Sequence, residues 1–207
     1  MIGDPNGVSK KGLLIVVEGI DGTGKSTLVK MLEESLKRRG FHVVSSFEPT
    51  NGTFGQRLRE SFSAQHRLSP EEELRLFTED RRQHVKELIA PALRAGKIVI
   101  LDRYYISTMA YQGARGLDPE DIRRQNEAFA PRPDIAFILE LEPEEALRRI
   151  SVKRGEVPNS FEALGYLKRV KAIFDSLDLP FIIRLNAAQP VEDVLKQALD
   201  PILARLG

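Results

Sequence analysis

The sequence predicts an α/β fold in which a parallel sheet lies between two layers of helices. Short apolar runs alternate with longer amphipathic segments along the 207 residues, and strands joined by helical crossovers form parallel sheets. Several runs are continuously apolar, which is typical of strands covered by helices on both faces. A glycine-rich sequence at residues 19–26 joins the first apolar run to the first amphipathic segment.

The apolar runs are the predicted strands. The runs at 98–101 and 135–139 contain no polar side chain, so we expect them in the covered centre of the sheet. The five predicted strands cover residues 13–17, 42–46, 98–101, 135–139 and 181–185.

The amphipathic segments are the predicted helices. Ser69 and Asp118 each precede a proline and acidic residues, and a cap residue, a first-turn proline and early acidic residues mark helix starts. Gly40 and Gly96 each follow an arginine at a predicted helix end, where glycine is favoured. The predicted helices cover residues 25–39, 54–63, 70–95, 119–129, 143–153, 160–177 and 190–205.

Composition indicates a single globular domain at 12–207 after a flexible leader at 1–11. Hydrophobic residues make up 42% of the chain, charged residues 29%, and the formal net charge is +1. This balance gives no reason to expect a nucleic-acid partner. The absence of cysteine excludes disulfides and thiolate zinc sites. No apolar segment approaches 18 residues, so we expect no membrane association and a cytoplasmic location.

Residues 19–26 read Gly-Ile-Asp-Gly-Thr-Gly-Lys-Ser and fit the phosphate-binding pattern G-x-x-x-x-G-K-[ST]. A loop that enters a helix after a strand directs several backbone N–H groups at one point, where the helix N-terminus is already electropositive. In this pattern Lys25 reaches the β- and γ-phosphates and the Ser26 hydroxyl binds Mg²⁺. The alternative is a glycine turn that merely ends a strand, but the flanking strand and helix favour nucleotide binding.

Polar residues that follow the other strands are the next candidates, because open parallel sheets bind ligands beyond the carboxyl ends of their strands. Asp102 follows the third strand and is expected to hold Mg²⁺ or its water shell. Arg103 is expected to clamp a phosphate, and the alternative for this pair is a surface ion pair. After the second strand, Glu48 and Pro49 form a turn before a helix that carries Arg57. Arg57 is expected at an acceptor phosphate, or else in solvent.

Two further features suit a nucleotide substrate. Phe77 and Arg81 are four residues apart and share a helix face; one side chain would stack on a planar heterocycle and the other would hydrogen-bond it, although core packing is the usual reason for such spacing. A basic run ending at Arg154 precedes residues 155–159, which we expect to form a mobile flap. Such a run is usually a solvated face, but it also supplies positive charge for a phosphoryl transition state.

The three histidines share no metal-ligand spacing. We therefore expect His42, His66 and His84 to be incidental to function.

From about residue 12 to residue 206, these motifs and their order resemble the thymidylate kinase family. The likeness includes residues 18–27, the Glu48-Pro49 turn, Phe77 with Arg81, residues 102–113 and the loop 185–190. The resemblance implies an α/β, three-layer P-loop kinase fold whose five parallel strands, counted along the chain, lie in the order 2-3-1-4-5. It also implies a short lid at about 150–160 and a homodimer. It implies transfer of the γ-phosphate of MgATP to dTMP, which gives dTDP and ADP.

The resemblance also implies roles for individual residues. Phe77 would stack on thymine, Arg81 would bond its edge, and Tyr111 would pack under the sugar and disfavour a 2′-hydroxyl. Arg149 would stack near adenine. The implied acceptor site comprises Glu48, Arg57, Phe77, Arg81, Arg103, Ser107, Thr108, Tyr111 and Gln112. The implied ATP site comprises Gly19, Asp21, Gly22, Thr23, Gly24, Lys25, Ser26, Thr27, Arg149 and Ala188.

The family supplies a catalytic arginine either in the loop, after the Asp, or in the lid. Here Gly22 follows Asp21, and the lid sequence 153–156 reads Lys-Arg-Gly-Glu, so the resemblance selects Arg154. The implied catalytic set is Lys25, Arg103, Arg154 and Asp21, with Ser26 and Asp102 at the metal.

Three departures from the family pattern leave alternatives open. The lid continues as Val-Pro-Asn-Ser-Phe-Glu over 157–162, Phe47 replaces the arginine common before Glu-Pro, and Thr50-Asn51 replaces Gly-Gly. One alternative is a kinase for another nucleoside monophosphate or for a deoxynucleoside. The other is a non-catalytic nucleotide-binding module that signals through a partner.

Overall fold

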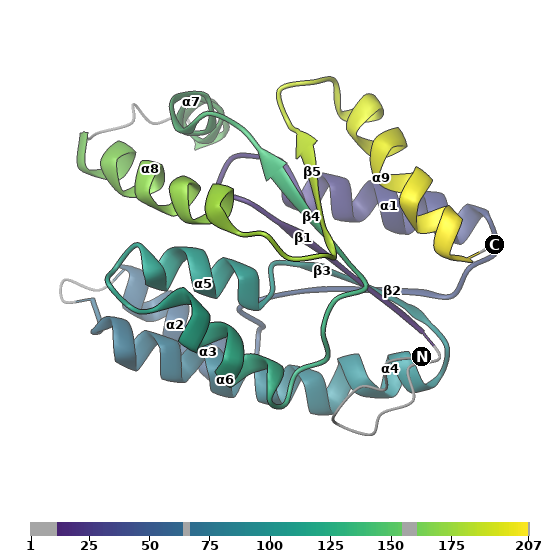
Figure 1. Cartoon of the computed structure of the whole chain (residues 1–207), viewed down its shortest axis with the longest axis horizontal. Helices are drawn as coiled ribbons and strands as arrows, with labels where there is room; N and C mark the ends of the chain where they lie inside the picture. The colour runs from purple at the N-terminus through teal and green to yellow at the C-terminus, as the bar shows by residue number, and fades with distance from the viewer. Residues whose placement is uncertain (1–11, 64–66, 155–160, 207) are drawn as a thin grey trace.

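The computed structural model describes residues 12–63, 67–154 and 161–206, and Figure 1 shows its arrangement. Its sheet is five-stranded and wholly parallel, in the order β2-β3-β1-β4-β5. This confirms the predicted order. The strands are β1 (Leu13–Glu18), β2 (Val43–Phe47), β3 (Ile98–Asp102), β4 (Ile135–Glu140) and β5 (Ile182–Asn186).

Helices cover both faces of the sheet, which makes the predicted three layers. Figure 1 shows α1 and α9 on one side and α2 to α6 on the other. The helix α8 packs against α5 and α7. The helices are α1 (Lys25–Arg38), α2 (Thr53–Ser63), α3 (Pro70–His84), the π-helical turn η1 (Val85–Ile89), α4 (Ala90–Arg94), α5 (Tyr105–Gly113), α6 (Pro119–Glu127), α7 (Pro143–Arg154), α8 (Phe161–Ser176) and α9 (Val191–Leu206).

The predicted helix ends are confirmed where a capping signal marked them. The Ser69 hydroxyl accepts from the backbone N–H of Glu72, and the Glu72 side chain accepts in return from the backbone of Ser69, so α3 begins with a capping box. Asp118 accepts from the backbone N–H of Glu120 and caps α6. The predicted helix 70–95 is continuous but is divided into α3, η1 and α4.

The sequence analysis assigned no element to residues 105–113, where the structure has the helix α5. Most of its residues are buried, including the polar Ser107, Thr108 and Gln112. A helix that is buried nearly all round lacks the amphipathic period by which helices are recognised, and this is why the prediction missed it.

The register of the sheet brings three strand ends to one edge. Asp102 at the end of β3 lies opposite Val17 of β1 and opposite Phe47 of β2. The residues that follow these positions, Glu18, Glu48 and Arg103, therefore meet at the carboxyl edge, where a parallel sheet binds its ligands.

The predicted leader at 1–11, the flap residues 155–159 and His66 lie outside the described residues. Within residues 12–63, 67–154 and 161–206, no helix has both the length and the apolar character needed to cross a bilayer.

Candidate active site

The glycine-rich loop has the backbone of an anion site. Gly24 caps α1 with a φ of 94°, a left-handed conformation that favours glycine. A Cβ on Gly22 would lie 2.4 Å from the carbonyl oxygen of Ala146, so α7 requires a residue without a side chain there. The loop and its surroundings line a cavity that we call the donor cavity. It is lined by Asp21, Gly22, Gly24, Lys25, Ser26, Thr27, Asp102, Arg103, Arg149 and Ile150.

Lys25 and Ser26 both line the donor cavity. Burial and the neighbouring Arg103 lower the pKa of Lys25 to about 8, and its Nζ donates to the carbonyl of Ile20 at 2.7 Å. The Ser26 hydroxyl donates to the carboxylate of Asp102. A hydroxyl and a carboxylate beside a phosphate-binding loop are hard oxygen ligands, so their chemistry fits Mg²⁺, which takes few protein ligands and keeps waters and phosphate oxygens.

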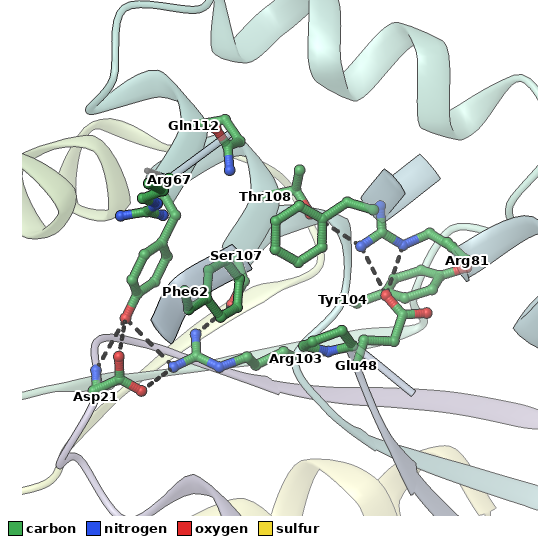
Figure 2. Close-up of a pocket in the computed structure, with 13 residues that line it drawn as sticks. Asp21, Glu48, Phe62, Arg67, Arg81, Arg103, Tyr104, Ser107, Thr108 and Gln112 are labelled. Carbon is green, nitrogen blue, oxygen red and sulfur yellow. Dashed lines mark hydrogen bonds and ion pairs between the residues drawn. The ribbon is translucent and has the colours of Figure 1, made fainter. Parts of the chain in front are cut away.

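A second cavity, the acceptor cavity, has a volume of about 240 Å³ and adjoins the first. Figure 2 shows its lining. Asp21 and Arg103 line both cavities, so the two spaces meet at these side chains. The acceptor cavity is lined by Asp21, Glu48, Pro49, Phe62, Arg67, Phe77, Arg81, Arg103, Tyr104, Ser107, Thr108, Tyr111 and Gln112.

Phe77 and Arg81 both face the acceptor cavity, as their spacing predicts. Phe77 is half-buried and lies among the lining residues with Phe62, whose ring centroid is 6.3 Å from that of Phe77. Phe62 is 45% exposed, and the guanidinium of Arg67 lies 5.3 Å from the centre of its ring. The sequence analysis missed Phe62 and Arg67. Neither forms a motif with the predicted residues. Phe62 meets Phe77 through the packing of α2 on α3, and Arg67, which lies before α3, contacts the ring of Phe62.

Arg81 is almost wholly buried and is fixed by three side chains. Its Nε donates to Glu48 at 2.8 Å, its Nη1 to Asn126 at 2.5 Å and its Nη2 to Thr108 at 3.0 Å. These partners come from β2's end, α6 and α5. Figure 2 shows the Glu48 and Thr108 contacts beside the ring of Tyr104. The guanidinium is therefore held rigidly at the wall of the cavity before any ligand binds.

His84 supports this arrangement, although we expected it to be incidental. Its Nδ1 lies 3.0 Å from Glu48 and its Nε2 lies 2.8 Å from the hydroxyl of Ser46. His84 and Arg81 therefore each contact one oxygen of the Glu48 carboxylate. Within the described residues no group of three or more His, Asp or Glu side chains fits a metal ion. A signal was present in the sequence, because Phe77, Arg81 and His84 are spaced four and three residues apart along one helix face.

Gln112 presents an unpaired acceptor at the wall of the acceptor cavity. Its Nε2 donates to Glu73 at 2.9 Å, while its Oε1 is buried and has no hydrogen-bond partner among the described residues. The fully buried Glu73 is held in turn by Arg67 at 2.6 Å and by an ion pair with Arg115 at 2.5 Å. Since Glu73 holds the amide nitrogen, Oε1 is the atom of Gln112 that lacks a hydrogen-bond donor.

Arg103 lies where the two cavities meet. Its Nη2 donates to Asp21 at 2.6 Å and its Nη1 to the hydroxyl of Ser107 at 2.9 Å. The Tyr111 hydroxyl donates to Asp21 at 3.1 Å. Figure 2 shows Asp21, Arg103 and Ser107 side by side. Desolvation opposes ionisation of Asp21, but Arg103 and Lys25 outweigh it and lower the pKa of Asp21 to about 2.

Some predicted residues lie elsewhere. Arg57 is exposed and lines neither cavity. Arg59 instead lines a neighbouring cavity with Ser26, Asp102 and Arg103, and it donates to the carbonyls of Pro49 and Thr50. Two residues along a helix turn the side chain by about 200°, so Arg57 and Arg59 face opposite sides of α2.

The predicted adenine contacts lie at two different cavities. Arg149 lines the donor cavity and donates to the carbonyl of Ala187 at 3.0 Å. Ala188 is exposed and lines a separate cavity with Glu145 and Asn186. α7 ends at Arg154, but the side chain of Arg154 lies outside the described part of the structure. Gly19 and Thr23 complete the loop; the Gly19 carbonyl accepts from Arg103 and the Thr23 hydroxyl donates to Ile20.

Comparison with known proteins agrees with this geometry. The family model described as thymidylate kinase matches residues 17–198. The chain belongs to the thymidylate kinase family. It is 48% identical to the thymidylate kinase of Desulfotalea psychrophila, over 91% of this chain and 93% of that one. It is 50% identical to the thymidylate kinase of Xanthomonas euvesicatoria, over 95% of this chain and 85% of the relative. It is 51% identical to the thymidylate kinase of Akkermansia muciniphila, over 89% of this chain and 88% of the relative.

The Glu48–Arg81 pair gives a stability prediction. We expect Glu48→Ala to lower the free energy of unfolding by about 3–5 kcal/mol, because it leaves the guanidinium of Arg81 buried without its counter-charge. Urea titration followed by circular dichroism measures this change. Glu120→Ala is the control: it removes an ion pair with Arg123 on the surface of α6, and we expect its unfolding midpoint to match that of the wild type. If the wild type, Glu48→Ala and Glu120→Ala had equal urea midpoints, Glu48 would not be the structural partner of Arg81.

Proposed function

We propose that this protein transfers the γ-phosphate of ATP to dTMP, forming dTDP and ADP. The observation that carries the proposal is the shared boundary of the two cavities, where Asp21 and Arg103 line both the phosphate-binding loop's cavity and the cavity walled by Phe77 and Arg81. Two phosphates that enter from the two sides would meet at Arg103. Membership of the thymidylate kinase family supports the choice of substrates.

The reaction needs little covalent chemistry from the protein. The attacking oxygen of a nucleoside monophosphate is already anionic, so no general base is required, and positioning with charge stabilisation supplies the rate. Lys25 would hold the phosphates of ATP, and Arg103 would hold the acceptor phosphate, joined by Arg59 rather than the exposed Arg57. Ser26 and Asp102 would hold Mg²⁺, which when bound neutralises charge on the phosphates.

The acceptor cavity favours a base of the thymine type. Phe77 offers a ring for stacking, and the buried Oε1 of Gln112 requires a donor. The N3–H of thymine is such a donor, whereas cytosine carries an acceptor at N3. An unpaired buried acceptor is costly, so cytosine would be rejected. Uracil offers the same donor and lacks only a methyl group, worth about 1–3 kcal/mol in a pocket.

The remaining roles are predictions from the resemblance. Arg154 would stabilise charge on the transferred phosphoryl group, the lid at about 150–160 would exclude water, and Arg149 would lie against adenine beside Ala188. We also propose that the enzyme is a homodimer and works in the cytoplasm. A gel-filtration mass of twice that of one chain would support the dimer.

A coupled ATP assay tests the proposed function. We expect ADP formation that depends on dTMP, weaker activity with dUMP, and little with CMP, AMP or thymidine. Lys25→Ala should abolish transfer, because it removes the phosphate clamp, while the variant stays folded. Preference for thymidine over dTMP would favour a deoxynucleoside kinase. Tight ATP binding by calorimetry without binding of dTMP would favour a non-catalytic module.

Arg154→Ala tests the lid. We expect kcat to fall by about 10³-fold or more, with dTMP binding little changed, if Arg154 acts on the transition state. Arg148→Ala is the matched control, since Arg148 is an arginine of the same helix that is 65% exposed and paired with Glu145; its kcat should stay near that of the wild type. A loss below tenfold for Arg154→Ala would remove it from the catalytic set.

Gln112→Leu tests the base contact. We expect kcat/KM for dTMP to fall by about 10- to 100-fold, because the N3–H of thymine would lose its acceptor. The ratio of activity on dTMP to activity on dCMP should fall as well, since leucine no longer distinguishes a donor from an acceptor. Gln125→Leu, at an exposed position of α6, is the control for the substitution. An unchanged dTMP:dCMP ratio would contradict the proposed contact.

A further inference from the structure

Glu18 is a buried carboxyl group that the roles above leave without a task. It is the last residue of β1, its side chain is fully buried, and it directly precedes the phosphate-binding loop. It therefore lies between the donor loop on one side and Arg103 on the other. A buried carboxylate with no function would be costly to keep.

Both oxygens of Glu18 hold the segment that carries Arg103. Oε1 accepts from the backbone N–H of Tyr104 at 2.9 Å, and Oε2 accepts from the hydroxyl of Ser107. The Ser107 oxygen accepts in turn from Nη1 of Arg103 at 2.9 Å. Glu18 thus fixes the backbone next to Arg103 directly and its guanidinium through one hydroxyl group.

The backbone of Arg103 needs such support. Its φ is 71°, and no other non-glycine residue in the described part of the chain has a positive φ. This left-handed conformation is unfavourable for a residue with a side chain and persists where the surrounding contacts hold it in place. The end of β1 provides this: the Val17 carbonyl accepts from the N–H of Arg103 at 3.0 Å, and Glu18 accepts from the next N–H.

We propose that Glu18 is a positioning residue that holds Arg103, through Tyr104 and Ser107, in the orientation that serves the phosphate groups of both substrates. The inference rests on the proposed function, because Arg103 is the side chain common to the donor and acceptor cavities. Glu18 itself contacts neither cavity and acts only through Arg103.

This position carries a cost to stability. Burial raises the pKa of Glu18 to about 7. The hydrogen bonds from Ser107 and from the Tyr104 N–H, and the charges of Arg103 and Arg81, act in the opposite direction but do not outweigh burial. Lys25 is a further cation nearby. Because this pKa is higher than the ordinary value of 4.5, the folded state binds more protons, and stability falls as pH rises from about 4.5 to 7. Above pH 7 the protein therefore keeps an ionised Glu18 although this buried charge lowers its free energy of unfolding.

Glu18→Gln separates positioning from structure. Glutamine keeps the size of the side chain and an acceptor for Tyr104, but it presents a donor to Ser107, whose oxygen already accepts from Arg103. We expect kcat with ATP and dTMP to fall by about 10²-fold, the scale of small misplacement in a site. ATP affinity by calorimetry should stay unchanged. The melting temperature at pH 8 should equal or exceed that of the wild type, since a buried charge is removed.

The pH dependence gives a second readout. Protonated Glu18 has the hydrogen-bonding pattern of glutamine, so the ratio of wild-type kcat to Glu18→Gln kcat should be smaller at pH 6 than at pH 8. Titration of the substrate phosphates is common to both proteins and cancels in this ratio. Asp134→Asn is the matched control: Asp134 accepts from the backbone N–H of Leu14 at the opposite end of β1, and its variant should keep the wild-type kcat.

Ser107→Ala keeps the proposal testable if the glutamine variant does not fold. It should also lower kcat, and the double variant should lose little more than either single variant, because both act through Arg103. A kcat within threefold of wild type for folded Glu18→Gln would overturn the inference. So would a loss of kcat matched by equal losses in ATP affinity and melting temperature. Wild-type protein without dTMP-dependent activity would instead reject the proposed function.

Discussion

The parallel register of β1, β2 and β3 is the constraint on which the rest of the site depends. Asp102 lies opposite Val17 and opposite Phe47, so three chain segments leave the sheet at the same level and in the same direction. One becomes the phosphate-binding loop, one carries Arg103, and one turns at Glu48. The sheet's hydrogen bonds therefore bring these three segments to one edge, against which α3 and α5 pack their own side chains.

The site is then made rigid by buried charges that hold one another. Glu48 fixes Arg81, Glu73 fixes Gln112, and Glu18 fixes the turn at Arg103. Buried ion pairs contribute little net stability, since desolvation offsets their attraction. Their value lies in preorganisation: each binding group is in place before the ligand arrives, so ordering it costs nothing at the moment of binding. All three carboxylates are buried.

The sequence predicted the elements well where local signals mark them. Capping residues, strand runs and the glycine-rich loop depend on neighbours in the chain, and the predicted boundaries agree with the structure to within two residues. The helix α5 and the partners of Arg81 were not predicted. α5 is buried nearly all round and shows no period, while Asn126 and His84 reach Arg81 and Glu48 only through tertiary packing. A pattern along one helix predicts that Phe77 and Arg81 share a face, but it does not predict which residues of other elements that face contacts.

The two cavities also differ in how far a sequence can specify them, and the difference is physical. A loop of the donor type binds phosphate through backbone N–H groups and a helix terminus, so its sequence signature is a conformation that favours glycine, and the motif can be recognised from sequence. In the proposed function the acceptor cavity would recognise a base through side chains of three helices, α2, α3 and α5, and of the segments that follow β1, β2 and β3. Its selectivity would then depend on the unpaired Oε1 of Gln112, whose amide nitrogen donates to Glu73. Under this proposal, discrimination between bases depends on the packing of α3 and α5, which explains why the motif predicts ATP more directly than it predicts the acceptor.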